Sequence, residues 1–103
     1  MPHFRLTKKA IEDFKEIGRY TQREWGRAQR NLYLSKLDAC FHMIAHEPGI
    51  GKPCDDIRPG YRKYHHGRHL VFYKQGISGS VDIVRILHDQ MDVESHLQDD
   101  LCF

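Results

Sequence analysis

The sequence has few cysteines and no long apolar run, and both deficits narrow the class of protein. Its three cysteines, Cys40, Cys54 and Cys102, are odd in number and widely spaced, so they predict no disulfide framework and fit a reducing cytoplasm. A transmembrane helix needs about 18 consecutive apolar residues, which the chain lacks. The start of the chain, MPHFRLTKKAIEDF, also lacks the apolar stretch of a secretory signal. We therefore expect a cytoplasmic protein.

The chain also has little net charge, although charged residues are frequent. Lysine and arginine number 16 and the acidic residues 14, which leaves a formal net charge of +2. This excludes a protein that binds polyanions with its whole surface, so any such binding needs a local basic cluster. With 103 residues and 40% hydrophobic content, we expect a single globular domain, residues 1–103, with a modest core.

Two helices are predicted in the first half of the chain. Thr7 can cap a helix that begins at Lys8 and ends at Gly26, and a second helix is predicted over residues 28–46 before Pro48, Gly49 and Gly51. Each has an apolar stripe at a spacing of three and four: Ile11, Phe14, Ile17, Thr21 and Trp25 in the first, and Tyr33, Leu34, Leu37, Cys40, Phe41 and Ile44 in the second. The short break predicts an antiparallel helical hairpin.

Alternating patterns predict strands elsewhere. Residues 3–7, HFRLT, predict a short strand, and residues 51–58 a loop. The run YRKYHHGRHLVFYK predicts a β-hairpin that turns near His66 and Gly67, and residues 80–88, SVDIVRILH, predict a central strand covered on both faces after a turn at Gly76 and Gly79. Asp92 can cap a short last helix that ends near Leu97.

The predicted class is α+β, in the order β-α-α-β-β-β, with the helical hairpin packed on a small, mostly antiparallel sheet. We expect six large side chains to be largely buried: Phe14, Trp25, Leu37, Phe41, Phe72 and Ile83.

Metal and cysteine chemistry fit the sequence poorly. His65 and His66 are adjacent in a predicted strand, so they point to opposite faces, and no carboxylate or cysteine completes a ligand set with His69. Cys54 has no base nearby in the sequence, and Cys40 lies on a helix stripe as a core residue would. We expect neither a metal nor another cofactor.

A ribonuclease is the more serious enzymatic hypothesis. Metal-free RNA cleavage needs a base, an acid and cations around the phosphate, which Arg62, Lys63, Arg68, Arg85 and His88 could supply. Three tyrosines could stack bases: Tyr61, Tyr64 and Tyr73. The alternative is that Phe72 and Tyr73 pack within the sheet and the charges lie on a solvated face.

Three segments resemble a known family: YTQREWG, then LYLSKLDACFHMIAHEPGIGKPCDDIRPGYRKYHHGRHLVFYK, then VRILHDQMD. Together they are similar to ParE toxins of bacterial type II toxin–antitoxin modules, from Phe4 to about Asp92. The most specific pieces are G-x-x-x-x-D-I-R-P-G-Y-R and R-I-L-H-x-x-M-D. The resemblance implies the RelE/ParE fold.

That superfamily has two functional branches, and the resemblance favours the one that poisons DNA gyrase by binding rather than by catalysis. The other branch cuts mRNA on the ribosome and usually has a tyrosine just after the last strand. Here no tyrosine follows Tyr73, so the mRNA-cutting function is the less favoured alternative. Its site would consist of Arg85, His88, Lys63 and Arg68. A third possibility is a toxin-like fold without toxicity that serves only as an antitoxin partner.

The resemblance also implies partners. A ParD-like antitoxin would dimerise through a ribbon–helix–helix domain that binds operator DNA, and its C-terminal segment would fold onto the toxin. Four cations are predicted to contact this segment: Arg5, Lys9, Arg62 and Arg68. Four arginines around Gly26 are predicted to contact gyrase, with ordinary helix solvation as the alternative: Arg19, Arg23, Arg27 and Arg30.

Overall fold

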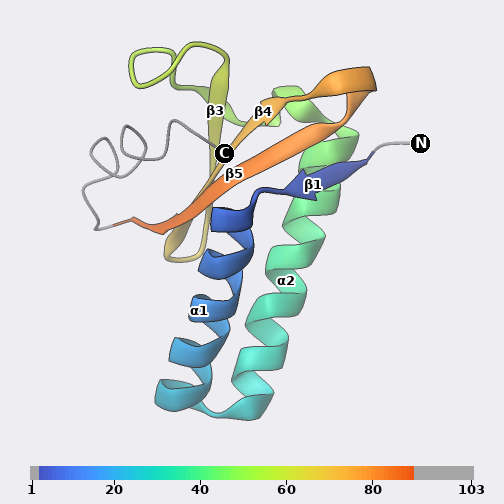
Figure 1. Ribbon diagram of the computed structural model, residues 1–103. Helices are drawn as coiled ribbons and strands as arrows, with labels where there is room; N and C mark the ends of the chain where they lie inside the picture. Colours follow the sequence, from blue (N-terminus) through green and yellow to red (C-terminus); the bar gives the residue numbers. More distant parts are fainter. Residues whose placement is uncertain (1–2, 90–103) are drawn as a thin grey trace.

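The computed structural model describes residues 3–89, and it has two helices packed on one face of a five-stranded sheet (Figure 1). The elements are β1 (Phe4–Leu6), α1 (Lys8–Trp25), α2 (Arg27–His46), β2 (Lys52–Pro53), β3 (Tyr61–His66), β4 (His69–Gln75) and β5 (Val81–His88), with short 3₁₀ helices at Pro48–Ile50 and Ile77–Gly79. The predicted α+β class is confirmed, and the elements follow the predicted order with one additional strand, β2. The predicted last helix after Asp92 lies outside the described residues.

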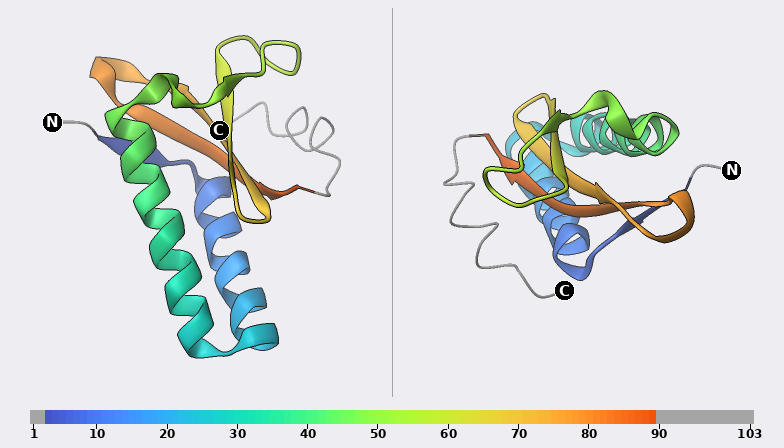
Figure 2. Two further views of the ribbon diagram at one scale, coloured as in Figure 1. Left: turned by 180° about the vertical axis from the view of Figure 1, so that it is seen from behind. Right: turned by 90° about the horizontal axis from the view of Figure 1, so that it is seen from above.

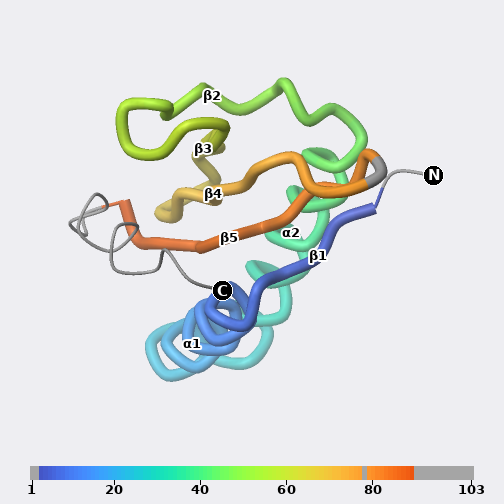
Figure 3. The backbone as a smooth tube through the Cα atoms, turned by 45° about the horizontal axis from the view of Figure 1, so that its top comes forward, coloured from blue at the N-terminus to red at the C-terminus, as the bar shows by residue number. Residues whose placement is uncertain are grey.

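The sheet has the order β1-β5-β4-β3-β2, which the tube in Figure 3 follows from one edge to the other. Only β1 and β5 pair in parallel, and the other three pairs are antiparallel. The strand β5 is therefore internal, and it is buried on both faces as predicted. Residues 51–58, predicted as a loop, contain one correction, since Lys52 and Pro53 pair with Lys63 and Arg62 as the edge strand β2.

Local chemistry sets both ends of α1. The Thr7 hydroxyl accepts a hydrogen bond from the backbone N–H of Ala10 at 3.1 Å and donates to the Val84 carbonyl at 2.8 Å, so the helix cap is also tied to β5. Gly26 ends α1 with φ at 93°, a conformation that glycine adopts without steric cost. The chain then re-enters α2 at Arg27, one residue earlier than predicted.

The main core lies between the two helices and the facing side of the sheet, which we call the helix side. Leu37, Phe41 and Ile44 of α2 are buried there against Tyr73 and Ile83. The view from behind in Figure 2 shows α2 crossing in front of β5 and β1, so the helix covers this face of the sheet. A smaller cluster covers the other face of the sheet: Cys54, Tyr61, Phe72, Val84 and Leu87.

Three of the predicted helix-stripe positions are wrong or overstated. Trp25 is 72% exposed and Ile11 is 41% exposed, whereas Phe14 is half-buried at the edge of the main core. The physical reason for Trp25 is geometric, because the end of α1 extends past the sheet and lies outside both hydrophobic cores. Ala10, outside the predicted stripe, takes the buried place beside β5 instead.

Candidate functional site

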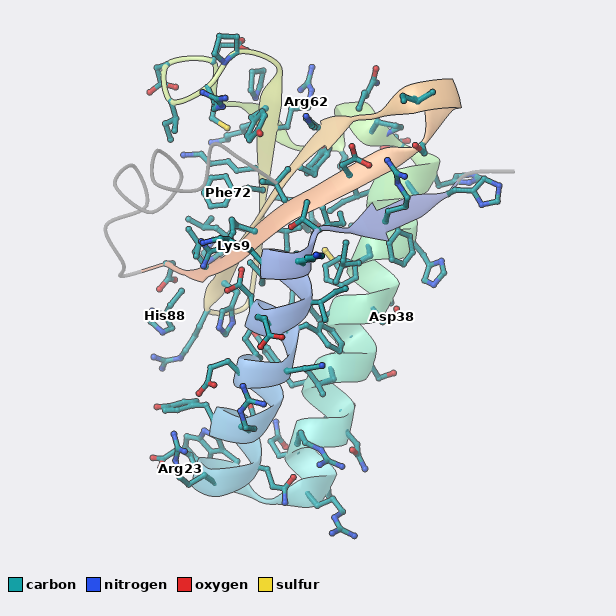
Figure 4. The ribbon with its side chains drawn as sticks, viewed as in Figure 1. Lys9, Arg23, Asp38, Arg62, Phe72 and His88 are labelled. Carbon is teal, nitrogen blue, oxygen red and sulfur yellow. The ribbon has the colours of Figure 1, made fainter. Side chains whose placement is uncertain are left out.

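The end of the helical hairpin carries an exposed aromatic and basic surface, which we call the tip surface and define as Tyr20, Arg23, Trp25 and Arg27. The guanidinium carbon of Arg23 lies 5.7 Å from the centre of the Tyr20 ring, a cation–π distance. In Figure 4, Arg23 lies at the far end of α1, away from the sheet. Sequence periodicity placed Trp25 in the core, so the aromatic half of this surface was missed.

The four arginines predicted to contact gyrase do not behave alike. Arg19 donates from Nη2 to Glu16 at 2.8 Å, and Arg30 donates to Gln22 and to Asn31. Arg23 stacks on Tyr20. Arg27 forms no side-chain hydrogen bond or ion pair within residues 3–89. Arg19 and Arg30 therefore form hydrogen bonds within the hairpin, whereas Arg23 and Arg27 are available to a partner.

A groove runs from the tip surface to the turn between β3 and β4. Its volume is about 440 Å³, and we call it the turn groove, lined among others by Tyr20, Trp25, Tyr33, Arg68, His69 and His88. The turn forms because Gly67 takes φ at 59°, which closes the hairpin tightly between His66 and His69. The groove therefore joins residues of both helices to the ends of β4 and β5.

A tyrosine and histidine cluster forms the inner wall of the turn groove. The Tyr33 hydroxyl lies 2.6 Å from Nδ1 of His69, and the ring centres of His69 and His88 are 5.5 Å apart. Burial lowers the pKa of His69 to about 4, with a further contribution from the nearby His88. Burial also raises the pKa of Tyr33. The imidazole of His69 is therefore neutral near pH 7, and its Nδ1 shares a structural hydrogen bond with the Tyr33 hydroxyl.

Arg85, the central cation of the ribonuclease hypothesis, is bound to a helix. Its Nε donates to Oδ2 of Asp13 at 2.7 Å and its Nη2 to Oδ1 at 2.9 Å, a two-point ion pair. Asp13 lies on α1, so the pair joins that helix to β5. Nothing in the sequence marked Asp13, because the two residues are 72 positions apart.

The other residues of the ribonuclease hypothesis come from β3, β5 and the turn between β3 and β4. His88 lies in the turn groove beside Arg68, whereas Lys63 pairs with Phe72 in the middle of the β3–β4 hairpin. Two of the tyrosines named for base stacking are buried: Tyr61 and Tyr73. Tyr73 uses its hydroxyl structurally, donating to the Pro48 carbonyl at 2.7 Å and accepting from the Gly51 N–H at 2.8 Å.

The cysteine and histidine residues considered for other chemistry are placed as follows. Cys40 and Cys54 are buried thiols, and burial raises the pKa of Cys40 to about 11 and also raises that of Cys54. His65 lies 3.4 Å from Asp89, whereas the His66 ring contacts Tyr33, so the two histidines face different neighbours. Residues 3–89 contain no group of three or more histidine, cysteine or acidic side chains placed to hold a metal ion.

The four cations predicted to bind an antitoxin lie in separate parts of the molecule. Arg5 on β1 pairs with Asp82 at 3.3 Å, and Arg62 on β3 donates to the Gly51 carbonyl at 2.7 Å. Figure 4 shows Arg62 at the opposite end of the molecule from Arg23. Lys9 is in the first turn of α1, and Arg68 is in the turn between β3 and β4. The strands β1 and β3 are separated by β5 and β4.

The architecture matches those of chains in solved structures from toxin–antitoxin systems. The chromosomal ParDE system of P. aeruginosa matches with a TM-score of 0.71 at 17% identity, over 85% of this chain and 96% of that one. The RelBE2 toxin–antitoxin complex of Mycobacterium tuberculosis matches with a TM-score of 0.59 at 20% identity, over 85% of this chain and 99% of that one. At these identities the likeness establishes the fold, which is the RelE/ParE fold.

Sequence comparison then gives the family. Residues 4–93 match the model of the ParE toxin of the type II toxin–antitoxin system, parDE, and the chain belongs to this family. Toxin ParE1 of Caulobacter vibrioides is 39% identical over 94% of this chain and 99% of its own length, and Toxin ParE1 of Mycobacterium tuberculosis is 41% identical over 89% and 94%. Toxin ParE of Escherichia coli is 35% identical over 98% of each chain. The family predicted from the sequence is confirmed.

Neither helix within residues 3–89 has the length and apolar content that crossing a membrane requires.

Proposed function

We propose that this ParE-family toxin acts by binding DNA gyrase and trapping its cleaved-DNA intermediate, without catalysing a reaction itself. Membership of the ParE toxin family carries the proposal. The ion pair of Arg85 with Asp13 supports an action without catalysis, because it engages the strongest candidate for phosphate stabilisation at the helix–sheet interface. A protein that acts without catalysis must bind one state of its target more tightly than the others. Since gyrase acts on chromosomal DNA, the proposed site of action is the cytoplasm.

The test of this proposal runs two assays side by side with the purified protein. Supercoiling by gyrase should be inhibited, and linear DNA from trapped cleavage complexes should accumulate, while ribosomes in a parallel reaction leave mRNA intact. Gyrase that is unaffected by a high molar excess of folded protein would overturn the target. Ribosome-dependent mRNA cleavage that disappears in the His88→Ala variant would instead support the ribonuclease alternative.

The proposed antitoxin is a ParD-like protein whose acidic C-terminal segment folds onto the toxin. The toxin–antitoxin neighbours in the structural comparison support a partner of this kind. Arg5, Lys9, Arg62 and Arg68 stay the proposed cationic contacts, and their separation over the sheet fits a segment that wraps around the molecule rather than one that fills a single pocket. The toxin would then reach operator DNA only through the antitoxin.

Binding kinetics test these contacts. Charge reversal at Arg5 and Arg68 should slow association with the antitoxin at low salt more than at high salt, because exposed charges mainly accelerate encounter. Reversal of exposed Lys36 on α2 is the matched control. Association that is indifferent to reversal at all four proposed positions would remove them from the antitoxin surface.

A further inference from the structure

The outer ends of the two helices contribute nothing to either core. Thr21 is the last buried residue of α1, and Tyr33 is the first residue of α2 that packs against the main core. Every residue from Gln22 to Gln29 is exposed, and Figure 1 shows this end of the hairpin extending beyond the sheet. The hairpin is therefore longer than the packing of its buried stripes requires, and the extension needs a reason other than folding.

The side chains on this extension are those that dominate protein–protein binding energies. Trp25 is 72% exposed and Tyr20 is 53% exposed, and Arg23 stacks on the Tyr20 ring. Tryptophan, tyrosine and arginine are the three residue types enriched at binding hot spots. A single exposed aromatic residue is ordinary on a protein surface. Here two aromatic residues and a stacked arginine lie within six positions of one another on a rigid helix end.

Charge is concentrated at the same place. Residues 19–30 contain four arginines and one glutamate, a net charge of +3, whereas the whole chain carries only +2. The remainder of the molecule is therefore slightly acidic when its histidines are neutral. A surface with this excess of positive charge is complementary to an acidic partner, and its field steers such a partner toward the hairpin end.

We propose that the tip surface, Tyr20, Arg23, Trp25 and Arg27, is the part of the protein that binds its target, and that the matching target surface is acidic with an apolar recess for Trp25. This inference rests on the proposed function for the identity of the target as gyrase. It commits the tip surface to the target and not to the antitoxin.

Two variants test the tip surface, each with a matched control. Trp25→Ala removes the aromatic anchor, and Leu32→Ala truncates another exposed apolar residue, 49% exposed, on α2. The double reversal Arg23→Glu/Arg27→Glu has Lys15→Glu/Lys36→Glu as a control of equal charge change on the same two helices. None of these positions is buried, so all four variants should retain the thermal stability of the parent.

The expected result is a loss of target binding without a loss of antitoxin binding. Each tip variant should bind gyrase about 30-fold or more weakly, the effect of removing a binding hot spot, and should trap correspondingly fewer cleavage complexes. Antitoxin affinity should stay within about twofold, and Trp25→Phe should restore part of the gyrase affinity because it restores an aromatic anchor. The controls should bind both partners as the parent does.

The remaining outcomes separate this inference from the proposed function. Tip variants that bind gyrase as the parent does overturn the tip surface and leave gyrase as the target. A parent that does not bind gyrase overturns the target, and growth arrest in cells then decides the tip surface: Trp25→Ala must lose arrest while it still binds antitoxin. Tip variants that lose antitoxin affinity but keep toxicity overturn the inference, as does a parent that neither binds gyrase nor arrests growth.

Discussion

Asp13 on α1 and Arg85 on β5 tie the helical hairpin to the middle of the sheet through one carboxylate. Besides the two bonds from the guanidinium, Oδ2 of Asp13 accepts the backbone N–H of Ile86 at 3.0 Å. Both side chains are mostly removed from water, at 12% and 15% exposure for Arg85 and Asp13. Each charge therefore gains part of its stabilisation from the other, and the pair joins α1 to β5.

Removing the carboxylate should destabilise the protein strongly. Asp13→Ala removes the carboxylate that pairs with the largely buried Arg85 guanidinium and accepts the Ile86 N–H. The free energy of unfolding should therefore fall by about 3 kcal/mol. The control is Asp38→Ala, which breaks an exposed contact with His42 at 3.4 Å and should cost less than about 1 kcal/mol. Urea denaturation gives both values. Equal losses of unfolding free energy in the two variants would show that the buried pair stabilises the protein no more than the exposed contact does.

Gly51 is required because Tyr73 approaches it closely. A Cβ at position 51 would lie 2.5 Å from the Tyr73 hydroxyl and 2.8 Å from the Lys63 carbonyl. We expect Gly51→Ala to lower the free energy of unfolding by roughly 1 to 3 kcal/mol, since either the hydroxyl must leave its bonds to Pro48 and Gly51 or the strand must shift. Gly49→Ala, with nothing within 4 Å of the added methyl, is the control and should change stability little. Thermal melts of the two variants that coincide would contradict this account.

The helix cap and the turns could be predicted from the sequence, because each is set by residues that are close together along the chain. Thr7, Gly26 and Gly67 mark a cap and two turns by local chemistry, and the structure has all three where predicted. Burial at the ends of elements depends instead on tertiary structure. The stripe that reaches Trp25 keeps its helical spacing past the point where the sheet stops, and periodicity cannot show where that point is.

The candidate site was harder to predict for the same reason. The arginines around Gly26 were visible in the sequence because they are close along the chain, whereas Asp13 and Arg85 come together only through the packing of α1 on β5. The strand β2 was missed because two residues carry no alternation to detect. Tyr33 and His69 meet only because the turn at Gly67 folds back onto α2, so no spacing rule points to them.

Phe41 and Trp25 provide a direct comparison between a buried and an exposed aromatic residue. Phe41 is 1% exposed, and its ring centre lies 5.6 Å from that of Phe4 and 6.0 Å from that of Phe14. Phe41→Ala should cost roughly 3 to 5 kcal/mol because it leaves a cavity in the main core. Trp25→Ala should change the melting temperature little, since it removes almost no buried contact. A large loss of stability from Trp25→Ala would mean that the end of α1 packs against the molecule.

The burial of His69 predicts a loss of stability in acid. Burial lowers the pKa of His69 to about 4 in the folded protein, whereas in the unfolded chain the pKa of this histidine is about 6.5. Between these values the unfolded state binds more protons, so the free energy of unfolding should fall as the pH drops from 6.5 toward 4 and then level off, with His69 contributing on the order of 2 to 3 kcal/mol. Because other groups face His69, namely His66, His88, Asp13 and Asp89, the test is a difference between proteins.

That difference is measured by urea denaturation of the parent and of His69→Gln, which keeps a hydrogen-bonding side chain for Tyr33 without a titrating group. The parent should lose more stability than the variant between pH 7 and pH 4.5, and the two slopes should agree above pH 7, where His69 is neutral in both states. Exposed His42→Gln is the control, because its side chain is 68% exposed and contributes no comparable burial. Parallel curves for the parent and His69→Gln across the whole range would show that His69 takes up its proton as readily in the folded protein as in the unfolded chain.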